Sequence, residues 1–361
     1  MEIKFYQAEC GDAAKIRFLG TDQKYHNIIV DSGYERTFRH VLADEIKEIE
    51  TQKEAIDLWV ISHIHDDHIG GVTSYIKSIK LGEIDDAVNS WFYNVPRVQK
   101  LPNSVATSSI SEAKSISQGD LLLEYLSKKR VRIQDITNDA KVKEFYGLRI
   151  SILSPDTSTL AKLRLKYSER TIEMERNEID SVSLAKAAPK HDYHLPLDKF
   201  DLKKWNEDDS IENRSSIAFI TEFENKRILW LADAHPSVIV TKLKELGYSK
   251  SKQIKCDWVK VTHHGSRGNN SDELFEMISC ENYLLSANGE NIHCLPTKEC
   301  ISRILNNAQR PHDSHYRFFF TYKSKLLLSM FDVDGVDVFN RFNFSMHFPM
   351  NGDKMINVLI R

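Results

Sequence analysis

Runs of apolar residues alternate along the chain with mixed segments, and their periodicity predicts strands and helices in turn. The continuous apolar runs Ile28–Val30 and Leu58–Ile61 predict strands covered on both faces, and alternation over Lys15–Leu19 predicts a half-buried strand. Apolar residues at helical spacing predict helices over 36–55 and about 70–79. Further strands are expected at 90–93, 148–153, 216–220, 227–231, 258–261 and 283–286, and further helices at 117–129, 236–246, after Ser271 and at 296–306. Strands that alternate with helices in this way favour an α/β layered fold.

Length and composition restrict the domain organisation. The chain has 361 residues, of which 41% are hydrophobic and 28% are charged, and this composition is typical of a soluble globular protein. Residues 156–212 are rich in charge and poor in long apolar runs, so we interpret them as a charged, partly helical insertion. Residues 310–361 are expected to form a C-terminal strand extension. We therefore expect a single domain over 1–361 that carries one insertion.

Charge and cysteine content bear on location and partners. The net charge of −3 does not favour a globally basic surface for nucleic acid. The first residues are typical of a strand rather than a signal peptide, and no window reaches about 18 consecutive apolar residues. The five cysteines are scattered and form no C-x-x-C pair, which favours reduced thiols. We expect a cytoplasmic protein that does not bind a membrane.

The densest chemistry follows the strand at Leu58–Ile61. The segment from His63 to His68 has the pattern H-x-H-x-D-H and precedes two glycines. On a tight loop, the alternate residues His63 and His65 can point to one side, while Asp67 and His68 can reach a second, neighbouring point. Nitrogen and oxygen ligands of this kind suit zinc, manganese or iron, and two neighbouring points suit a pair of divalent ions.

This segment resembles the signature of the metallo-β-lactamase fold superfamily, and other landmarks of that family follow in the same order. Asp31-Ser32-Gly33 resembles its early aspartate motif, Trp230–Ala234 resembles the later strand-end aspartate that bridges two metals, and Val261–Ser266 and His293 resemble its late histidine motifs. The resemblance implies a metallo-β-lactamase-like four-layer αββα sandwich that binds two divalent metal ions, zinc or manganese.

A narrower resemblance rests on three short motifs. Gly11-Asp12-Ala13, Asn213–Ser216 and Lys260–Ser266 are similar to motifs of the soluble catalytic domain of ComEC-type DNA-uptake proteins. The membrane channel of those proteins has no counterpart here, so the chain is similar to a stand-alone soluble relative. This resemblance implies a nuclease.

The superfamily resemblance assigns the metal ligands. It implies that the ligand set is His63, His65, Asp67, His68, Asp233 and His293. Asp31 is expected to orient a ligand histidine from behind. The family's middle histidine is missing, because the matching region is Asn213–Ser216. We expect His263, or His191 or His194 from the insertion, to complete the first site.

Other residues are candidates for catalysis and substrate binding. Asp67, His263 and His264 are the candidate catalytic residues, and one of the two histidines is expected to protonate the leaving oxygen. Strand parity favours His263 as the inward-pointing one. Ser266 and Arg267 lie on a predicted loop before a helix, where they are expected to hold a substrate phosphate. The ComEC-type resemblance implies that Asn213 and Ser216 line the same pocket.

These observations predict a metal-dependent hydrolase of phosphodiester bonds, most simply a nuclease that cleaves DNA with a hydroxide generated at the metals. Two alternatives stay open. A small-molecule hydrolase, acting on a cyclic nucleotide, a lactone or a thioester, would use the same chemistry, because fold alone does not choose the substrate. A non-catalytic regulatory subunit would explain the missing middle histidine. DNA is the expected partner, and a protein partner or a homo-oligomer is also open.

Overall fold

Two β-sheets form the centre of the molecule in the computed structural model, which describes residues 1–97, 110–173 and 190–360. Within those residues the first sheet has six strands in the order β16-β1-β2-β3-β4-β5. The strands are β16 (Met355–Leu359), β1 (Glu2–Tyr6), β2 (Ala14–Leu19), β3 (Tyr25–Val30), β4 (Ile56–Ile61) and β5 (Trp91–Tyr93). β1, β2 and β3 pair antiparallel, whereas β3, β4 and β5 are parallel.

The second sheet has eight strands in the described residues, in the order β15-β14-β13-β11-β9-β8-β7-β6. They are β15 (Phe344–His347), β14 (Tyr316–Phe320), β13 (Asn282–Leu285), β11 (Trp258–Lys260), β9 (Lys226–Trp230), β8 (Ala218–Phe223), β7 (Leu148–Ser154) and β6 (Lys143–Phe145). Strands β9, β11, β13, β14 and β15 all run parallel. A short parallel pair, β10 (Ile254–Lys255) and β12 (Ile278–Ser279), lies beside this sheet.

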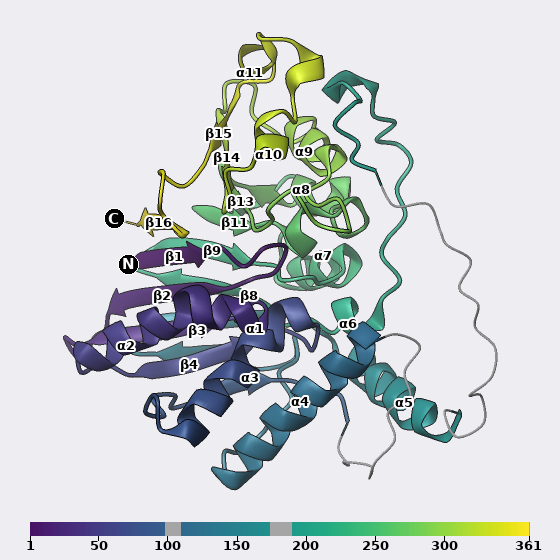
Figure 1. The fold of residues 1–361 in the computed structure, drawn as a ribbon. Helices are drawn as coiled ribbons and strands as arrows, with labels where there is room; N and C mark the ends of the chain where they lie inside the picture. The colour runs from purple at the N-terminus through teal and green to yellow at the C-terminus, as the bar shows by residue number, and fades with distance from the viewer. Residues whose placement is uncertain (98–109, 174–189, 361) are drawn as a thin grey trace.

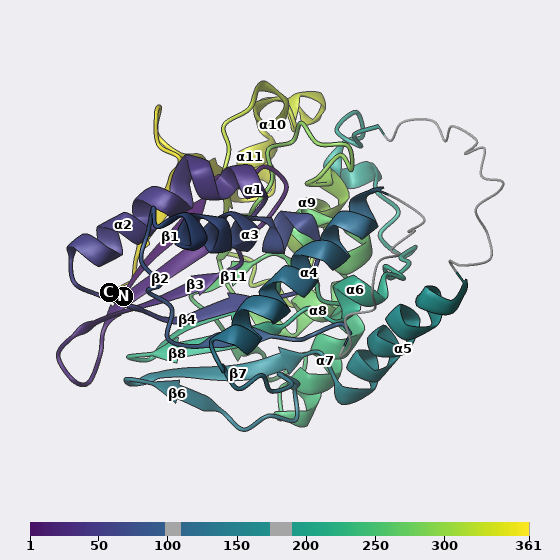
Figure 2. The same cartoon turned by 60° about the horizontal axis from the view of Figure 1, so that its bottom comes forward.

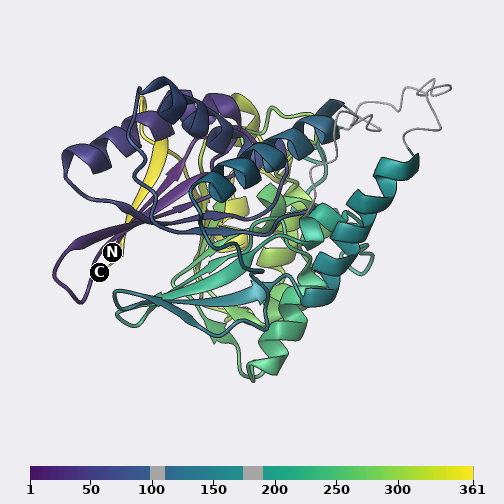
Figure 3. The same cartoon turned by 90° about the horizontal axis from the view of Figure 1, so that it is seen from below.

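Helices cover the outer face of each sheet, so the molecule has four layers. On the first sheet lie α1 (Glu35–Thr37), a π-helical turn over Phe38–Leu42, α2 (Ala43–Thr51), α3 (Asp66–Leu81) and α4 (Ile110–Lys128). On the second sheet lie α7 (Pro236–Glu245), α8 (Asp272–Glu276) and α9 (Lys298–Leu305). Figures 1 and 2 show these two groups of helices, and Figure 3 shows the purple and blue helices above the strands with green helical turns below them.

Three apolar clusters fill the spaces between these layers. One lies between the two sheets and includes Phe5, Ile16, Ile150 and Trp230. A second packs the first sheet against α2, α3 and α4, and a third packs the second sheet against α7, α8 and α9. Because both faces of each sheet are covered, its central strands are continuously apolar, as the runs in the sequence predict. The predicted α/β class and the αββα layering are confirmed.

The segment interpreted as an insertion has two described parts. Helix α5 (Thr157–Glu173) contributes buried Leu163 and Tyr167 to the cluster beneath α4. Residues 190–210 form a strap, which contains one 3-10 turn at Leu197–Lys199 and leads into α6 (Ile211–Arg214). Residues 174–189 lie outside the described residues, so the full extent of the predicted insertion stays a prediction.

The strap is tied to α9 by buried polar contacts. Both carboxylate oxygens of Asp192 accept backbone N–H groups at the start of α9, from Lys298 and Glu299 at 2.9 Å each. The Tyr193 hydroxyl donates to the Pro296 carbonyl at 2.8 Å. These contacts hold the strap against the second sheet's helices, and residues 207–213 then reach the carboxyl ends of the strands.

The C-terminal region adds strands to both sheets. β14 and β15 extend the second sheet, while β16 pairs antiparallel with β1 at the edge of the first sheet, so both termini lie together (Figure 1). Two short helices, α10 (Lys325–Leu328) and α11 (Val338–Arg341), lie between β14 and β15 in the chain. The sequence pattern predicted only strands in this region, so these two helices were not expected. Among the described helices, none is both long enough and apolar enough to cross a membrane.

Candidate metal centre

The candidate site lies where strands of both sheets end. Asp31 follows β3, His63 follows β4, Asp233 follows β9, and His263 and His264 follow β11. Each of these strands runs parallel to a neighbour, so their carboxyl ends open at one edge of the sandwich. The two facing sheets therefore bring residues about 200 positions apart into one buried cluster.

Close packing at the start of α3 explains the glycines that follow the histidine cluster. A Cβ atom at Gly71 would lie 2.3 Å from the Ser32 carbonyl oxygen, and one at Gly11 would lie 2.2 Å from the Asp67 carbonyl oxygen. Neither position has room for a side chain. The first helical turn, which carries Asp67 and His68, therefore sits directly against the turns after β1 and β3.

Two groups of metal-type ligands share one carboxylate in the described residues. His63, His65 and Asp233 form the first group, and Asp12, His68, Asp233 and His264 form the second. Within each group, the ligand atoms lie within 4.8 Å of one another. Asp233 is 1% exposed and belongs to both groups, which is the arrangement expected of a carboxylate that bridges two ions.

The second group has the spacing of a metal site. His68 Nε2 and His264 Nε2 are 3.3 Å apart, and Asp233 Oδ1 lies 3.4 and 3.5 Å from them. Asp67 Oδ2 lies 3.4 Å from His264 Nε2 and 3.8 Å from His68 Nε2. Four ligand atoms placed tetrahedrally at about 2.1 Å from zinc are about 3.4 Å apart. The four atoms therefore leave room for one ion among them.

The hydrogen bonds behind the imidazoles direct their lone pairs into the site. His68 Nδ1 lies 2.9 Å from Asp31 Oδ2, and His264 Nδ1 lies 3.0 Å from the Ser286 carbonyl oxygen. Because these partners are acceptors, Nδ1 carries the proton and Nε2 carries the lone pair in each neutral ring. Two Nε2 lone pairs that face each other at 3.3 Å require a proton or a cation between them.

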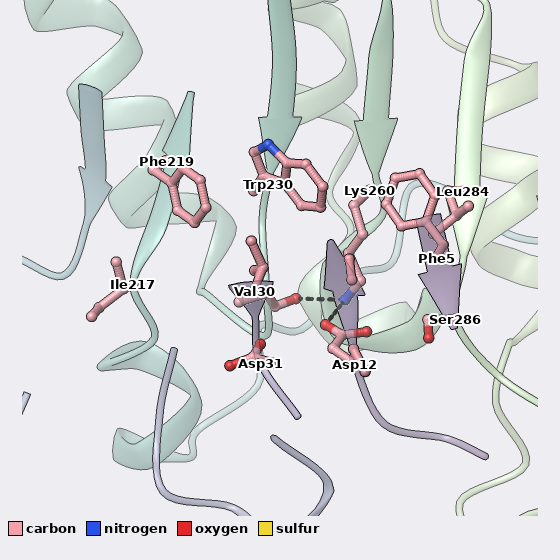
Figure 4. A pocket seen from close by; sticks show the side chains of 13 residues that line it. Phe5, Asp12, Val30, Asp31, Ile217, Phe219, Trp230, Lys260, Leu284 and Ser286 are labelled. Atoms are coloured by element: carbon pink, nitrogen blue, oxygen red, sulfur yellow. Dashed lines mark hydrogen bonds and ion pairs between the residues drawn. The ribbon is translucent and has the colours of Figure 1, made fainter. Parts of the chain in front are cut away.

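Asp12 lies behind the imidazoles rather than among the inward-facing atoms. Its Oδ1 is 3.3 Å from His264 Nδ1, and its Oδ2 accepts a hydrogen bond from Lys260 Nζ. Figure 4 shows this pair between the two sheets, beside a cavity of about 20 Å³ that is large enough for about one water molecule. Asp12 faces Nδ1 and is paired with an ammonium, so it is placed to support His264 from behind, whereas Asp67 Oδ2 lies on the Nε2 side at 3.4 Å.

The first group contains buried polar atoms that have no protein partner. His63 Nδ1 lies 3.2 Å from Ser62 Oγ, which leaves Nε2 directed toward Asp233 Oδ2 at 3.9 Å. His63 Nε2 in this group and Asp233 Oδ1 on the side of the second group are both buried without a hydrogen-bond partner. A buried polar atom without a partner is costly, and one cation at each group would satisfy them. The residues therefore fit a pair of divalent ions.

Burial and nearby charges separate the four histidines into two pairs. Burial lowers the pKa of His63 and of His65, so both rings are neutral and can ligate at neutral pH. Burial also acts to lower the pKa of His68 and His264, but the Asp233 carboxylate and its neighbours outweigh it. They raise the pKa of His68 well above its usual value and that of His264 to about 9. Uptake of a cation at this second group therefore displaces protons.

The backbone is held in an uncommon conformation around the site. Asp31, Ala232, His263 and His264 have φ angles of 55°, 44°, 45° and 53°. Left-handed backbone is unfavourable for residues other than glycine and is found mainly where the surrounding structure enforces it, often at functional sites. These four residues all follow strand ends that face the cluster, so the strain coincides with the candidate ligands.

The other candidate residues belong to neither ligand group of the described residues and differ in burial. The Asn213 amide donates to Asp208 Oδ2 at 2.6 Å, and the Ser216 hydroxyl is fully buried with no hydrogen-bond partner. Arg267 is exposed, and Ser266 is half-buried. His293 is also exposed and belongs to neither ligand group in the described residues. Its assignment as a ligand stays a prediction.

Sequence reasoning missed the residues that support the ligands from behind. Asp12 was noticed only as part of a motif, and Lys260, Asp208 and Asn269 were not singled out. Lys260 and Asp12 are 248 residues apart, and no local periodicity connects them. The Gly11-Asp12 dipeptide after the first strand was the available signal, since the missing Cβ of Gly11 permits the close approach to Asp67.

We expect Asp31→Asn to weaken metal binding by about 10- to 100-fold, because outer partners of ligand histidines contribute about that much to affinity. Asp31 accepts from His68 Nδ1 and from both Ser62 N and Oγ, at 2.7–2.9 Å. Competition titration with a metal chelator measures the effect. Asp44→Asn, an exposed change on α2, is the matched control. Equal affinities in both variants would contradict the role of Asp31.

Comparison with known proteins finds a family model that matches part of the chain and solved structures that are similar to it. Residues 23–84 match the family model described as the metallo-beta-lactamase superfamily. The search of curated proteins found no match. Among solved structures, the chain is similar to CmlA, a diiron beta-hydroxylase from Streptomyces venezuelae, at 12% identity and a TM-score of 0.42, over 99% of this chain and 54% of that chain.

A second similar structure is that of a protein described as a metal-dependent hydrolase from Parabacteroides distasonis. It is 11% identical, with a TM-score of 0.34, over 86% of this chain and 93% of that chain. The chain spans about half the length of the hydroxylase. The matched segment holds Asp31, His63, His65, Asp67 and His68. Residues 23–84 thus match the metallo-beta-lactamase superfamily model, and they lie within an αββα sandwich.

Proposed function

We propose that this protein hydrolyses phosphodiester bonds with the help of two divalent metal ions, and that DNA is its substrate. The observation that carries the proposal is the pair of ligand groups that share the buried carboxylate of Asp233. When bound, two such ions lower the pKa of water and stabilise negative charge on phosphoryl oxygens. No redox residue or covalent nucleophile is needed for that chemistry.

The chain's own residues would hold the ions and keep the site dry. His63 and His65 would bind the first ion, and Asp67, His68 and His264 would bind the second, with Asp233 between them. Asp31 and the Ser286 carbonyl hold His68 and His264 in the required tautomers. Because most of these ligands are buried and His68 and His264 are fixed from behind, the site needs little reorganisation to act.

A pocket of about 550 Å³ opens beside His263 and supports an anionic, partly aromatic substrate. The Trp205 indole donates from Nε1 to the Arg267 carbonyl at 2.8 Å, which holds the ring next to the Arg267 side chain. An indole face can stack on a base, and a guanidinium can bind a phosphate. The pocket is lined by Asp201, Lys204, Trp205, Asn206, Glu207, Asp208, His263, Ser266, Arg267, Gly268, Asn269 and Glu299.

The carboxylates of this pocket are engaged by other groups, so they oppose a phosphate less than their number suggests. Glu299 pairs with buried Arg303 at 2.9 Å, and Glu207 accepts from the Ser237 backbone and hydroxyl at 2.8 Å. Asp208 accepts from Asn213 and Asn269. The ComEC-type motifs at Gly11–Ala13, Asn213–Ser216 and Lys260–Ser266 support DNA as the substrate, and the scattered cysteines, which form no C-x-x-C pair, support a cytoplasmic location.

The test is cleavage of single- and double-stranded DNA by the purified protein supplied with Mn²⁺ or Zn²⁺. We expect the double variant Asp67→Ala/His68→Ala to lose cleavage by at least about 10³-fold, because one ion site is removed. His312→Ala/Asp313→Ala is the matched control, since it removes an adjacent and fully exposed histidine and aspartate. Full activity in the first variant would refute the mechanism.

A small-molecule hydrolase is the second candidate, and the size of the pocket favours it. About 550 Å³ lies within the range of about 300–1,000 Å³ typical of small-ligand sites. A salt titration separates the two. Cleavage of DNA should weaken steeply with salt through counterion release, whereas a neutral lactone should be nearly unaffected. Bound metal without DNA cleavage would shift the assignment to the small-molecule hydrolase.

A further inference from the structure

We propose that His263 is the fourth ligand of the first metal ion and takes the place of the missing middle histidine. The inference rests on the two-ion site of the proposed function and assigns to His263 a role other than protonating the leaving oxygen. His263 Nε2 lies 3.5 Å from Asp233 Oδ2, the same oxygen that His63 Nε2 faces at 3.9 Å. Both distances match the spacing of ligands around one ion.

The orientation of the Asn269 amide determines which His263 nitrogen carries the proton. Asn269 Nδ2 donates to Asp208 Oδ2 and to the Asp233 carbonyl, both at 3.1 Å. Because Nδ2 has these two acceptors, Oδ1 must be the atom that faces His263 Nδ1, at 2.7 Å. An amide oxygen only accepts, so His263 Nδ1 donates.

It follows that the lone pair of a neutral His263 ring lies on Nε2 and points at a carboxylate oxygen. Two electron-rich atoms that face each other repel unless a cation or a proton lies between them. At 3.5 Å, the pair is at the limit for a hydrogen bond from a protonated Nε2. The separation suits a metal ion that binds both atoms.

The surroundings hold His263 in this position. Its φ and ψ angles are 45° and 53°, in the left-handed region that a histidine rarely adopts. Its backbone N–H donates to the Ala232 carbonyl at 2.7 Å, next to Asp233. The Asn213 amide on α6 donates to Asp208 on the strap at 2.6 Å, and Asp208 also accepts from Asn269. The strap and α6 therefore fix the Asn269 amide, which orients the His263 ring. We infer that Asp208 and Asn269 are positioning residues for this ligand.

His194, a candidate for the fourth position, and Glu212, a nearby carboxylate, both make contacts elsewhere. His194 is exposed, and its Nδ1 lies 3.1 Å from the His191 carbonyl on a strap that is tied to α9. The carboxylate of Glu212 binds Lys166 and accepts from the Tyr167 hydroxyl. His191, His194, Glu212 and His263 all lie outside the two ligand groups of the described residues, but His263 Nε2 lies 3.5 Å from an Asp233 oxygen.

The test is metal binding by full-length His263→Ala, measured by elemental analysis, by chelator competition and by the visible spectrum of the cobalt-loaded protein. We expect wild type to hold about two ions, and the variant to keep one and to bind the other at least about 100-fold more weakly. His263→Asn, which tolerates left-handed backbone better, should lose the same ion if the protein folds normally. Asn269→Leu should weaken the same ion less, and His312→Ala should bind like wild type.

The outcomes separate this inference from the proposed function. If wild type holds two ions and cleaves DNA, but His263→Ala binds both with unchanged affinity and an unchanged cobalt spectrum, the inference is wrong and the proposed function stands. Loss of the first ion in His191→Ala or His194→Ala, with His263→Ala unaffected, would also overturn it. If wild type binds no divalent ion, both are wrong.

Discussion

Asp233→Asn is expected to reduce hydrolysis by about 10³-fold or more and to weaken the binding of both metal ions, because the negative charge that they share is lost. The two oxygens of Asp233 face different ligand groups, since Oδ1 lies near His68 and His264 while Oδ2 lies near His63 and His263. An amide keeps one acceptor but turns an N–H₂ group toward the other ion. Loss of metal Lewis acidity removes several kcal/mol of transition-state stabilisation, and about 4 kcal/mol corresponds to about 10³-fold.

The measurement is cleavage rate together with metal content in the same preparation. Asp209→Asn is the matched control, because Asp209 is exposed on the strap and belongs to neither ligand group. A variant at Asp233 that bound one of the two ions with unchanged affinity would show that the carboxylate does not bridge. Retention of both ions and of full activity would remove the basis for a shared site.

Asp334→Asn is expected to lower the free energy of unfolding by about 3–5 kcal/mol, because it leaves a buried ammonium without its counter-charge. Lys298 and Asp334 are both buried and form an ion pair between α9 and the 3-10 turn over Asp332–Asp334. Asp334 Oδ1 also accepts from the Leu197 backbone at 2.6 Å, and asparagine can keep that contact. The change therefore isolates the loss of charge.

Urea unfolding followed by circular dichroism measures this effect. Asp332→Asn is the control, because Asp332 is exposed on the same turn. The double variant Lys298→Met/Asp334→Leu should recover most of the loss, since well-packed apolar residues often replace a buried ion pair at little cost. If Asp334→Asn were as stable as the control, the pair would contribute nothing to holding the strap on α9.

Residues that are adjacent in the chain account for what could be predicted at the site. His63, His65, Asp67 and His68 fall within six positions, so the connectivity of the chain alone keeps them close together. The aspartates after strands were predictable for a similar reason, since parallel strands bring their carboxyl ends to one edge. The continuous apolar runs predicted central strands because both faces of each sheet are covered.

Contacts between distant segments account for what could not be predicted. The pairing of β16 with β1 joins residues about 350 positions apart, and nothing in strand periodicity selects the partner of an edge strand. Helices α10 and α11 are four residues each and end before a periodic pattern can develop. The pocket beside His263 arises because the strap lies across the ends of the second sheet.

The chain by itself determined the α/β class, the main strands and helices, and the ligand types clustered after β4, because local periodicity and sequence proximity carry that information. Only the tertiary structure decided which nitrogen of each histidine faces the centre, since the hydrogen bonds that the rings donate to Asp31, Ser286 and Asn269 set the tautomers. It also placed Lys260 and Asp12 behind His264 and brought His263 to Asp233. Those contacts depend on how two sheets pack, which no single segment of sequence specifies.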